Sequence, residues 1–135
     1  HSAYEPTVGK VNHQYSKTVE FERDFQEYCR KFVATDLRYF SFLRPLCELK
    51  IAEIFCGNFL EKYDGNFSSC NRNFKIRENS AKIGSWCGEC PKCAFVFLIF
   101  SPFLERERIL KLFGKNLFAD AVLEPVFREI LGLAD

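Results

Sequence analysis

The stretch SWCGECPKCAF, residues 85–95, holds three cysteines spaced Cys-x2-Cys-x2-Cys, and a fourth cysteine precedes it at position 70. Tetrahedral Zn²⁺ takes four soft thiolates, and two-residue spacers let the backbone fold around a single ion. Gly88 and Pro91, which lie in the spacers, favour tight turns that aim backbone amides at the sulfur atoms. We therefore predict a closed, structural zinc site with four ligands: Cys70, Cys87, Cys90 and Cys93.

Spacing alone leaves other interpretations of these cysteines open: disulfides, a redox Cys-x2-Cys pair or a three-cysteine iron–sulfur site. The chain has seven cysteines, an odd number, and no recognisable signal peptide, so we expect a cytoplasmic protein rather than a secreted disulfide scaffold. The remaining three are expected to be small buried hydrophobes on helices: Cys29, Cys47 and Cys56.

Composition indicates one globular domain with a sizeable core. The chain has 135 residues, of which 47% are hydrophobic and sixteen are Phe, and about two-thirds of the unfolded surface can be buried at this length. A net charge of +1 does not favour nucleic acid as a partner. The longest apolar run, residues 94–100, is too short to span a bilayer, so we expect no membrane partner. The chain lacks Met, and we expect it to be a piece of a longer protein.

Hydrophobic periodicity predicts a mainly α-helical fold with few strands. A first helix capped by Ser16 has an apolar stripe with helical spacing, formed by Phe21, Phe25, Tyr28, Cys29 and Phe32. A second helix should run from about residue 47 to 56 and stop at Gly57 and Asn58. Residues 1–15 are expected to form a loop, 63–66 a turn, and 67–83 an extended, looped segment.

The C-terminal half is expected to hold three further helices. Pro91 should open one that is apolar on every side through Phe100 and must therefore be buried. Residues 104–113 and 117–131 have the pattern of two amphipathic helices separated by Gly114. We predict a single domain over residues 1–135, with a helical part, 1–66, and a part with the cysteine cluster and terminal helices, 67–135.

Two polar clusters are candidate binding sites. Asn71, Arg72 and Asn73 directly follow a predicted metal ligand, so a metal-held backbone would fix a guanidinium and two amides toward a carboxylate or phosphate. The alternative is a surface arginine beside turn-forming asparagines. The second cluster crowds the predicted start of the first helix, where an anion would be favoured, although a solvated helix cap is an equally simple interpretation; it comprises His13, Gln14, Tyr15 and Lys17.

Several motifs resemble known families. The run PLCELKIAEI, residues 45–54, followed by the cysteine cluster, resembles the C-terminal part of PP-loop ATP pyrophosphatases such as 7-cyano-7-deazaguanine synthase. A closer likeness runs from about residue 2 to 133 and rests on VNHQYSK (11–17), SCNRNF (69–74) and WCGECPKCAFVFL (86–98). These motifs resemble the UDP-N-acetylmuramoyl-L-alanyl-L-glutamate epimerase family.

The resemblance implies the C-terminal part of a PP-loop-like α/β enzyme of bacterial peptidoglycan synthesis. Such an enzyme would use ATP, with Mg²⁺, to invert the terminal L-glutamate of a UDP-linked muramoyl dipeptide. It implies charge stabilisation or proton transfer for His13 and Lys17, and substrate binding for Gln14, Tyr15, Asn71, Arg72 and Asn73. The phosphate-binding Ser-Gly-Gly-x-Asp-Ser loop is absent from this chain, so we expect the isolated chain to be inactive. A PP-loop enzyme that modifies a nucleotide or base, and a non-catalytic zinc-stabilised domain, are the alternatives.

Overall fold

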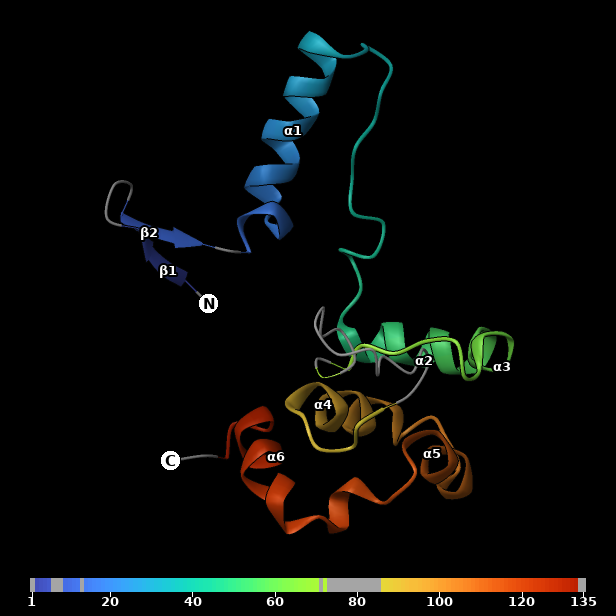
Figure 1. Cartoon of the computed structure of the whole chain (residues 1–135). Coiled ribbons are helices and arrows are strands. Elements are labelled where there is room, and N and C mark those ends of the chain that lie inside the picture. The colour runs from blue at the N-terminus through green and yellow to red at the C-terminus, as the bar shows by residue number, and fades with distance from the viewer. Residues whose placement is uncertain (1, 6–8, 13, 71, 73–85, 134–135) are drawn as a thin grey trace. The chain divides into compact units, whose positions relative to one another are not determined.

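The computed structural model describes residues 2–5, 9–12, 14–70, 72 and 86–133. The chain divides into two compact units, residues 1–45 and 46–135 (Figure 1). Helices dominate the described part, which confirms the mainly α-helical prediction. Among the described residues, no helix combines the length and the apolar character needed to cross a bilayer.

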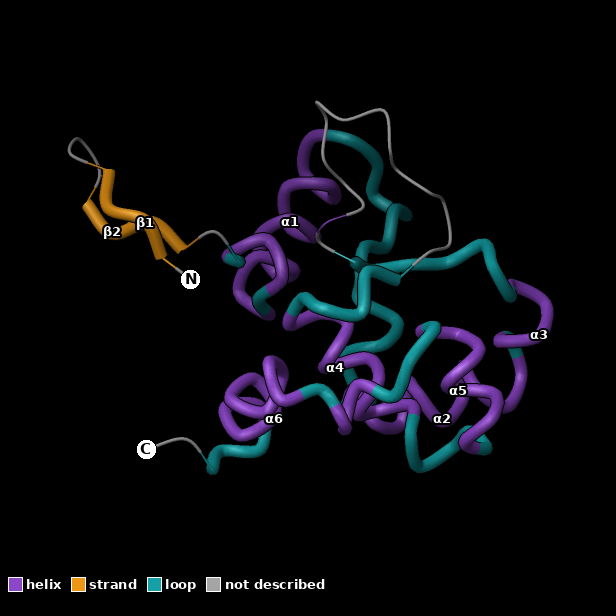
Figure 2. The backbone as a smooth tube through the Cα atoms, turned by 60° about the horizontal axis from the view of Figure 1, so that its bottom comes forward, coloured by secondary structure: helices purple, strands orange, loops and turns teal. Residues whose placement is uncertain are grey.

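The first unit begins with a β-hairpin. Strand β1, Ser2–Glu5, pairs antiparallel with β2, Gly9–Asn12, in a register that sets Ser2 opposite Asn12 and Glu5 opposite Gly9 (Figure 2). The prediction of a loop over residues 1–15 is wrong for these strands. Each strand is only four residues long, too short for the alternation of apolar and polar residues to be recognised.

Helix α1, Val19–Phe32, confirms the first predicted helix, but its cap differs from the prediction. Ser16 lies in a 3-10 turn, Tyr15–Lys17, and Thr18 is the N-cap. The Thr18 backbone is extended, and its side-chain oxygen accepts a hydrogen bond from the Phe21 N–H at 3.2 Å. The first backbone N–H groups of a helix have no carbonyl partner within the helix. The hydroxyl oxygen of an N-cap residue accepts a hydrogen bond from one of them.

The segment after α1 runs back along the helix and is held there by polar contacts (Figure 1). Gln26 donates from Nε2 to the Tyr39 carbonyl at 2.6 Å, and the Glu22 carboxylate accepts from the Ser41 N–H at 2.9 Å. Arg44 donates to the same carboxylate from Nη2 at 2.9 Å and from Nε at 3.2 Å. These bonds tie residues 39–44 to the first half of α1.

The second unit is built around helix α4, Pro91–Phe100. It packs against α2 (Glu48–Asn58), α5 (Arg106–Phe113) and α6 (Glu124–Ile130), while the short α3 (Leu60–Tyr63) follows α2. The expected turn at residues 63–66 is present, with the Asn66 N–H donating to the Tyr63 carbonyl at 2.9 Å. The predicted stop of the second helix is wrong by a few residues, because Gly57 and Asn58 lie inside α2 and Phe59 is its C-cap.

The prediction of a buried, wholly apolar helix is confirmed in α4. Pro91 occupies the first turn, where a missing N–H costs no hydrogen bond. Lys92, in the same first turn, is exposed. From residue 93 to residue 100 every side chain is half-buried or buried, and the buried ones are Cys93, Ala94, Val96, Phe97 and Phe100. The surrounding core is formed by Trp86, Ile109, Phe113, Leu117, Leu123 and Phe127, among others.

The end of the chain confirms one helix and corrects another. Helix α5 ends at Gly114, whose φ of +76° is the left-handed conformation that glycine tolerates at a C-cap. The single helix predicted over residues 117–131 is wrong: two 3-10 turns, Leu117–Ala119 and Ala121–Leu123, precede α6. Asn116 and Asp120 each accept from a backbone N–H two residues ahead at 3.1 Å, which caps the short turns instead of extending a helix.

The division of the chain places α2 in the second unit, where it packs on α4. The sequence-based partition assigned the same helix to residues 1–66. That the whole chain forms a single domain stays a prediction. The segment 67–83, expected to be extended, is described only over residues 67–70 and 72 and otherwise lies outside the described residues.

The three cysteines outside the cluster differ in burial. Cys29 is buried in the first unit, as expected, and Cys56 is half-buried in α2. The expectation is wrong for Cys47, which is exposed because it is the N-cap of α2 and lies outside the packed face.

Candidate metal centre

The sulfur atoms of Cys70, Cys87, Cys90 and Cys93 all lie within 4.8 Å of one another. Three of the six separations are 3.5 Å between Cys90 and Cys93, 3.7 Å between Cys87 and Cys93, and 3.9 Å between Cys70 and Cys90. Four sulfurs arranged tetrahedrally at about 2.3 Å from one zinc ion would stand about 3.8 Å apart. The sulfurs are too distant to be bonded, and all four cysteines are free, which speaks against the disulfide alternative.

A tight turn sets the first two ligands of the Cys-x2-Cys-x2-Cys motif. Gly88 has φ +67°, and a Cβ placed there would lie 3.0 Å from Cε of Lys115 and 3.4 Å from Cδ2 of Leu117. The left-handed backbone conformation favours glycine, while the nearest neighbour, the flexible end of Lys115, could move to make room for a Cβ. The turn directs the Glu89 N–H toward the sulfur of Cys87 at 3.4 Å, the amide-to-sulfur contact expected from the motif.

The other ligands come from the start of α4 and from the preceding segment. Cys90 is the N-cap of α4 and Cys93 lies in its first turn, where the helix dipole favours a negatively charged sulfur. Cys70 arrives from a distant part of the chain and is fully buried. Its N–H donates to Oγ of Ser68 at 3.1 Å, which orients the backbone at the ligand.

In the absence of a metal ion, the surroundings of the cluster favour neutral thiols. Burial raises the pKa of the Cys87 and Cys93 thiols, since a thiolate loses solvation inside the protein, and the neighbouring thiols of the cluster add to this effect for Cys93. The hydrogen bond from the Glu89 N–H acts in the opposite direction on Cys87. A divalent cation among the sulfurs would reverse the balance and favour the thiolates. The four cysteines therefore form a group able to hold a metal ion.

Arg72 lies at the exposed edge of this cluster. Its guanidinium forms an ion pair with the carboxylate of Glu89, the residue between Cys87 and Cys90. Glu89 is also the main cause of a raised pKa for Arg72, with a smaller contribution from the cysteines. The structure thus places Arg72 beside the cysteine turn, whereas Asn71 and Asn73 lie outside the described residues. Substrate binding by these three residues stays a prediction.

The second predicted cluster belongs to the first unit. His13 lies outside the described residues, while the other three members share the turn that precedes α1. Tyr15 donates from its hydroxyl to the Asp24 carboxylate at 2.9 Å, which raises the pKa of the tyrosine. Lys17 is exposed, and its carbonyl accepts from Arg44. The turn brings Gln14, Tyr15 and Lys17 together, and their roles stay predictions.

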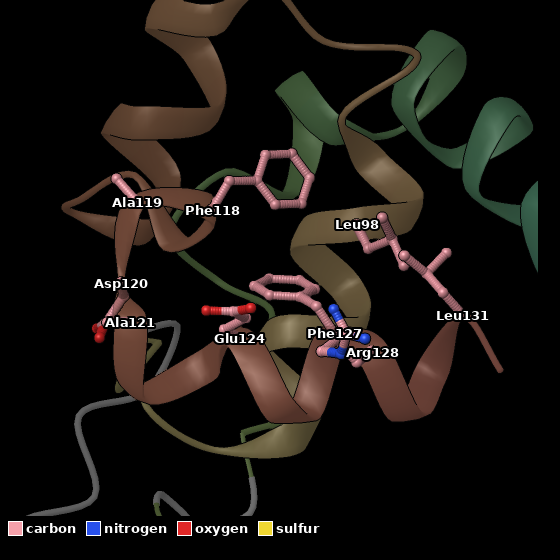
Figure 3. Close-up of a pocket in the computed structure, with 9 residues that line it drawn as sticks. All are labelled: Leu98, Phe118, Ala119, Asp120, Ala121, Glu124, Phe127, Arg128 and Leu131. Carbon is pink, nitrogen blue, oxygen red and sulfur yellow. The ribbon is translucent and has the colours of Figure 1, made fainter. Parts of the chain in front are cut away.

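A pocket of about 500 Å³ over α6 contains none of the predicted site residues (Figure 3). Its lining combines the aromatic rings of Phe118 and Phe127, whose centroids lie 5.1 Å apart, with the charged side chains of Glu124 and Arg128. The spacing of Glu124 and Arg128, one helical turn apart, was the available signal in the sequence. The pocket could not be recognised from this spacing, because one side of it is formed by the two 3-10 turns, and the sequence predicts a continuous helix there.

Two family models match this chain, and the boundary between their matches lies close to the boundary between the two structural units. Residues 1–42 match the family model described as the MurL N-terminal domain, and residues 66–135 match the one described as the MurL C-terminal domain. The structural division between Pro45 and Leu46 falls in the interval between these two matches. No solved structure matches the chain.

Curated relatives carry the name UDP-N-acetyl-alpha-D-muramoyl-L-alanyl-L-glutamate epimerase. The protein from Xanthomonas oryzae pv. oryzae is 46% identical over 96% of this chain and 28% of its own length. The proteins from a Micromonospora species and from Salinispora tropica are 43% and 44% identical over 92% of this chain, and over 27% and 26% of their own lengths. The chain therefore spans about a quarter of the curated relatives that it matches.

The family models cover most of the chain, in the order N-terminal domain and then C-terminal domain, and the cysteine turn, Gly88 and α4 all lie within the second match. This chain belongs to the MurL family.

Proposed function

We propose that this chain is part of an ATP-dependent epimerase that inverts the terminal L-glutamate of UDP-N-acetylmuramoyl-L-alanyl-L-glutamate, a precursor of bacterial peptidoglycan. The observation that carries the proposal is the epimerase name shared by relatives 43–46% identical over nearly the whole chain. Because the proposed reaction uses ATP and a UDP-linked precursor, we expect it to take place in the cytoplasm.

Inversion requires a step that makes the α hydrogen of glutamate acidic. In the proposed reaction the substrate carboxylate attacks ATP, takes up AMP and releases pyrophosphate, with Mg²⁺ offsetting the phosphate charge. The adenylate removes the negative charge of the carboxylate, so that a base can take the α proton and a proton can return from the opposite face. Water then hydrolyses the adenylate and releases AMP with the inverted carboxylate.

The ATP site belongs to a PP-loop fold of the complete protein in this proposal. The phosphate-binding loop of that fold is absent from residues 1–135. We therefore expect the isolated chain neither to hydrolyse ATP nor to epimerise the dipeptide. Turnover by the isolated chain would contradict this part of the proposal.

The residue roles follow the family resemblance. His13 and Lys17 would stabilise charge or transfer a proton, while Gln14, Tyr15, Asn71 and Asn73 would contact the substrate. Arg72 would bind a carboxylate or phosphate through charge-assisted hydrogen bonds. Because the guanidinium of Arg72 already pairs with Glu89, an incoming anion would have to share the guanidinium with that carboxylate or displace it.

The metal in this proposal is structural zinc, held by Cys70, Cys87, Cys90 and Cys93. The closeness of the four sulfurs, all within 4.8 Å of one another, and the burial of three of the four cysteines support a closed four-thiolate site. Zinc would supply folding free energy by joining the segment before Cys70 to the start of α4. Metal analysis should find one zinc ion per chain, and iron at this site would contradict the assignment.

Isotope incorporation tests the reaction directly. The complete protein is incubated with the UDP-linked dipeptide, ATP and Mg²⁺ in heavy water, and the glutamate is recovered and analysed by mass spectrometry and chiral chromatography. We expect deuterium at the α carbon of the inverted product, because the bond between that carbon and its hydrogen must break. Inversion without deuterium, or deuterium uptake without ATP, would contradict the proposed order of steps. No inversion at all would refute the epimerase assignment.

The same assay tests Arg72. Replacing it by Ala should remove a charge-assisted contact to the substrate and lower kcat/KM by roughly 30-fold to 1,000-fold. Arg72→Lys should recover little, since an ammonium cannot reproduce the planar fork. The matched control is Glu89→Gln, which removes the ion-pair partner and keeps the guanidinium. Normal turnover by a folded, zinc-loaded Arg72→Ala protein would show that Arg72 serves only its pair with Glu89.

A further inference from the structure

One side of the first unit carries a continuous row of aromatic rings. Along α1 the rings of successive members lie 5.2–6.2 Å apart, centre to centre, and a ring from the returning segment meets the row edge-on at 4.8 Å. We call this set the aromatic row. It consists of Phe21, Phe25, Tyr28 and Phe32 on α1, and of Tyr39 on the returning segment.

The aromatic row is largely uncovered. Phe32 is 72% exposed and Tyr28 53% exposed. In the adjacent segment Phe40 and Phe42 are 60% and 80% exposed. Among the described side chains of residues 14–45, Cys29 alone is buried. Soluble proteins rarely leave contiguous apolar surface of this kind open, and such patches mark interfaces.

The other side of α1 is charged and differs sharply from the row. Glu27 and Lys31 form an ion pair at 2.7 Å, and a polar pocket beside them is lined by Arg23, Arg30 and Arg38, among others. A helix with one charged and one aromatic side is suited to lie at the surface of a domain, with the aromatic side against its core. The partner of the row must therefore be apolar.

We infer that the aromatic row packs against the remaining part of the MurL N-terminal domain in the same polypeptide. Residues 1–42 match the model of that domain, and relatives carry about three-quarters of their length outside the stretch that they share with this chain. A domain buries the apolar sides of its own helices in its own core. The described residues of the first unit form a two-stranded hairpin, a 3-10 turn and one α-helix, which are too few elements to form such a core.

The test compares two substitutions on α1 of the complete protein. Phe32→Asp places a carboxylate in the aromatic row, and the matched control Arg30→Asp places the same side chain on the exposed surface of the same helix. Amide hydrogen exchange of α1 is followed by mass spectrometry. We expect exchange to accelerate roughly tenfold or more in Phe32→Asp and to change little in the control, because only the first variant forces a charge into a packed interface.

Two further measurements keep the inference falsifiable. Phe32→Leu retains apolar volume, so it should keep most of the protection even if Phe32→Asp fails to accumulate. Equal exchange in Phe32→Asp and Arg30→Asp would overturn the inference. Sedimentation decides whether a second copy covers the row instead: a dimer that Phe32→Asp converts to a monomer with unchanged exchange in α1 would also overturn it.

Discussion

The two units of this chain use their aromatic residues in opposite ways. The second unit encloses several of its rings: Phe97 and Phe100 of α4 and Phe113 of α5 are buried together with three of the four clustered cysteines. The first unit aligns its rings along one side of α1 and leaves most of them exposed. Hydrophobicity alone therefore does not indicate which helix has a core of its own.

The difference follows from how apolar residues are distributed around each helix. In α4 they occur on every side, so the helix must be enclosed, and α2, α5 and α6 enclose it. In α1 they form one stripe, which needs only one partner, and among the aromatic rings of the returning segment Tyr39 contacts it. The second unit should accordingly depend on its own core and metal, and the first on surface supplied by the rest of the protein.

The largest expected effect comes from breaking the metal centre. Cys90→Ser removes a buried ligand at the start of α4, and the second unit should lose its cooperative unfolding transition because metal binding supplies folding free energy there. The fluorescence of the only tryptophan, Trp86, reports on this unit because it is part of its core. Hydrogen exchange in α1 should stay unchanged.

The control for this variant is Cys29→Ser in the first unit. A buried cysteine without metal ligation should cost only about 1 kcal/mol of stability when replaced. Equal losses from Cys90→Ser and Cys29→Ser would contradict both the metal assignment and the proposed contrast between the units.

A smaller effect is expected from two matched core truncations. Phe97 is 2% exposed and Phe25 is 36% exposed. Phe97→Ala should cost about 3–5 kcal/mol through lost burial and the cavity left behind. In the isolated chain Phe25→Ala should cost only about 1 kcal/mol. Both losses of stability are measured by denaturant unfolding, with hydrogen exchange used to detect the unfolding of each unit separately. Similar losses would mean that the row is already packed within this chain.

The smallest effect concerns pH and the returning segment. Hydrogen bonds from Arg44 and from the Ser41 N–H lower the pKa of Glu22 below its ordinary value. A depressed pKa contributes stability above the unfolded value of about 4.3, and this is lost as pH falls through the folded value. The protection of the amides of residues 39–44, taken relative to their intrinsic exchange rate at each pH, should therefore fall as the pH drops below about 4.3.

Glu22→Gln supplies the control for the pH experiment, because the amide does not titrate over the same range. The variant should exchange faster at neutral pH and lose the acid-dependent step. If the acid-dependent loss of protection persisted in Glu22→Gln, another carboxyl group would be its cause.

Elements with strong local signals were predictable from the sequence. Helix α1 has a regular stripe, α4 has Pro91 at its start and an unbroken apolar run, and α5 has a glycine at its end. The cysteine cluster was predictable because two-residue spacers constrain where ligands can lie. Family membership followed from long motifs and is shown by the comparisons.

Features with competing local signals were not predictable. Thr18 and Ser16 are both acceptable caps, and only the backbone conformation selects Thr18. Residues 117–131 have helical periodicity, yet Asn116 and Asp120 bond to nearby amides and break the helix into turns. The pairing of Arg72 with Glu89 joins residues seventeen positions apart, which no local pattern reveals.

The sequence by itself determined the four cysteines that could hold a metal ion, the burial of α4 and the family, because these depend on residue type and short spacing. The tertiary structure alone decided where the chain divides, that α2 packs on α4, that Arg72 faces Glu89, and that the stripe of α1 remains exposed. Each of these depends on which surfaces meet across long sequence separations. A hydrophobic pattern specifies that a side must be covered, but the covering partner depends on the packing of the whole protein.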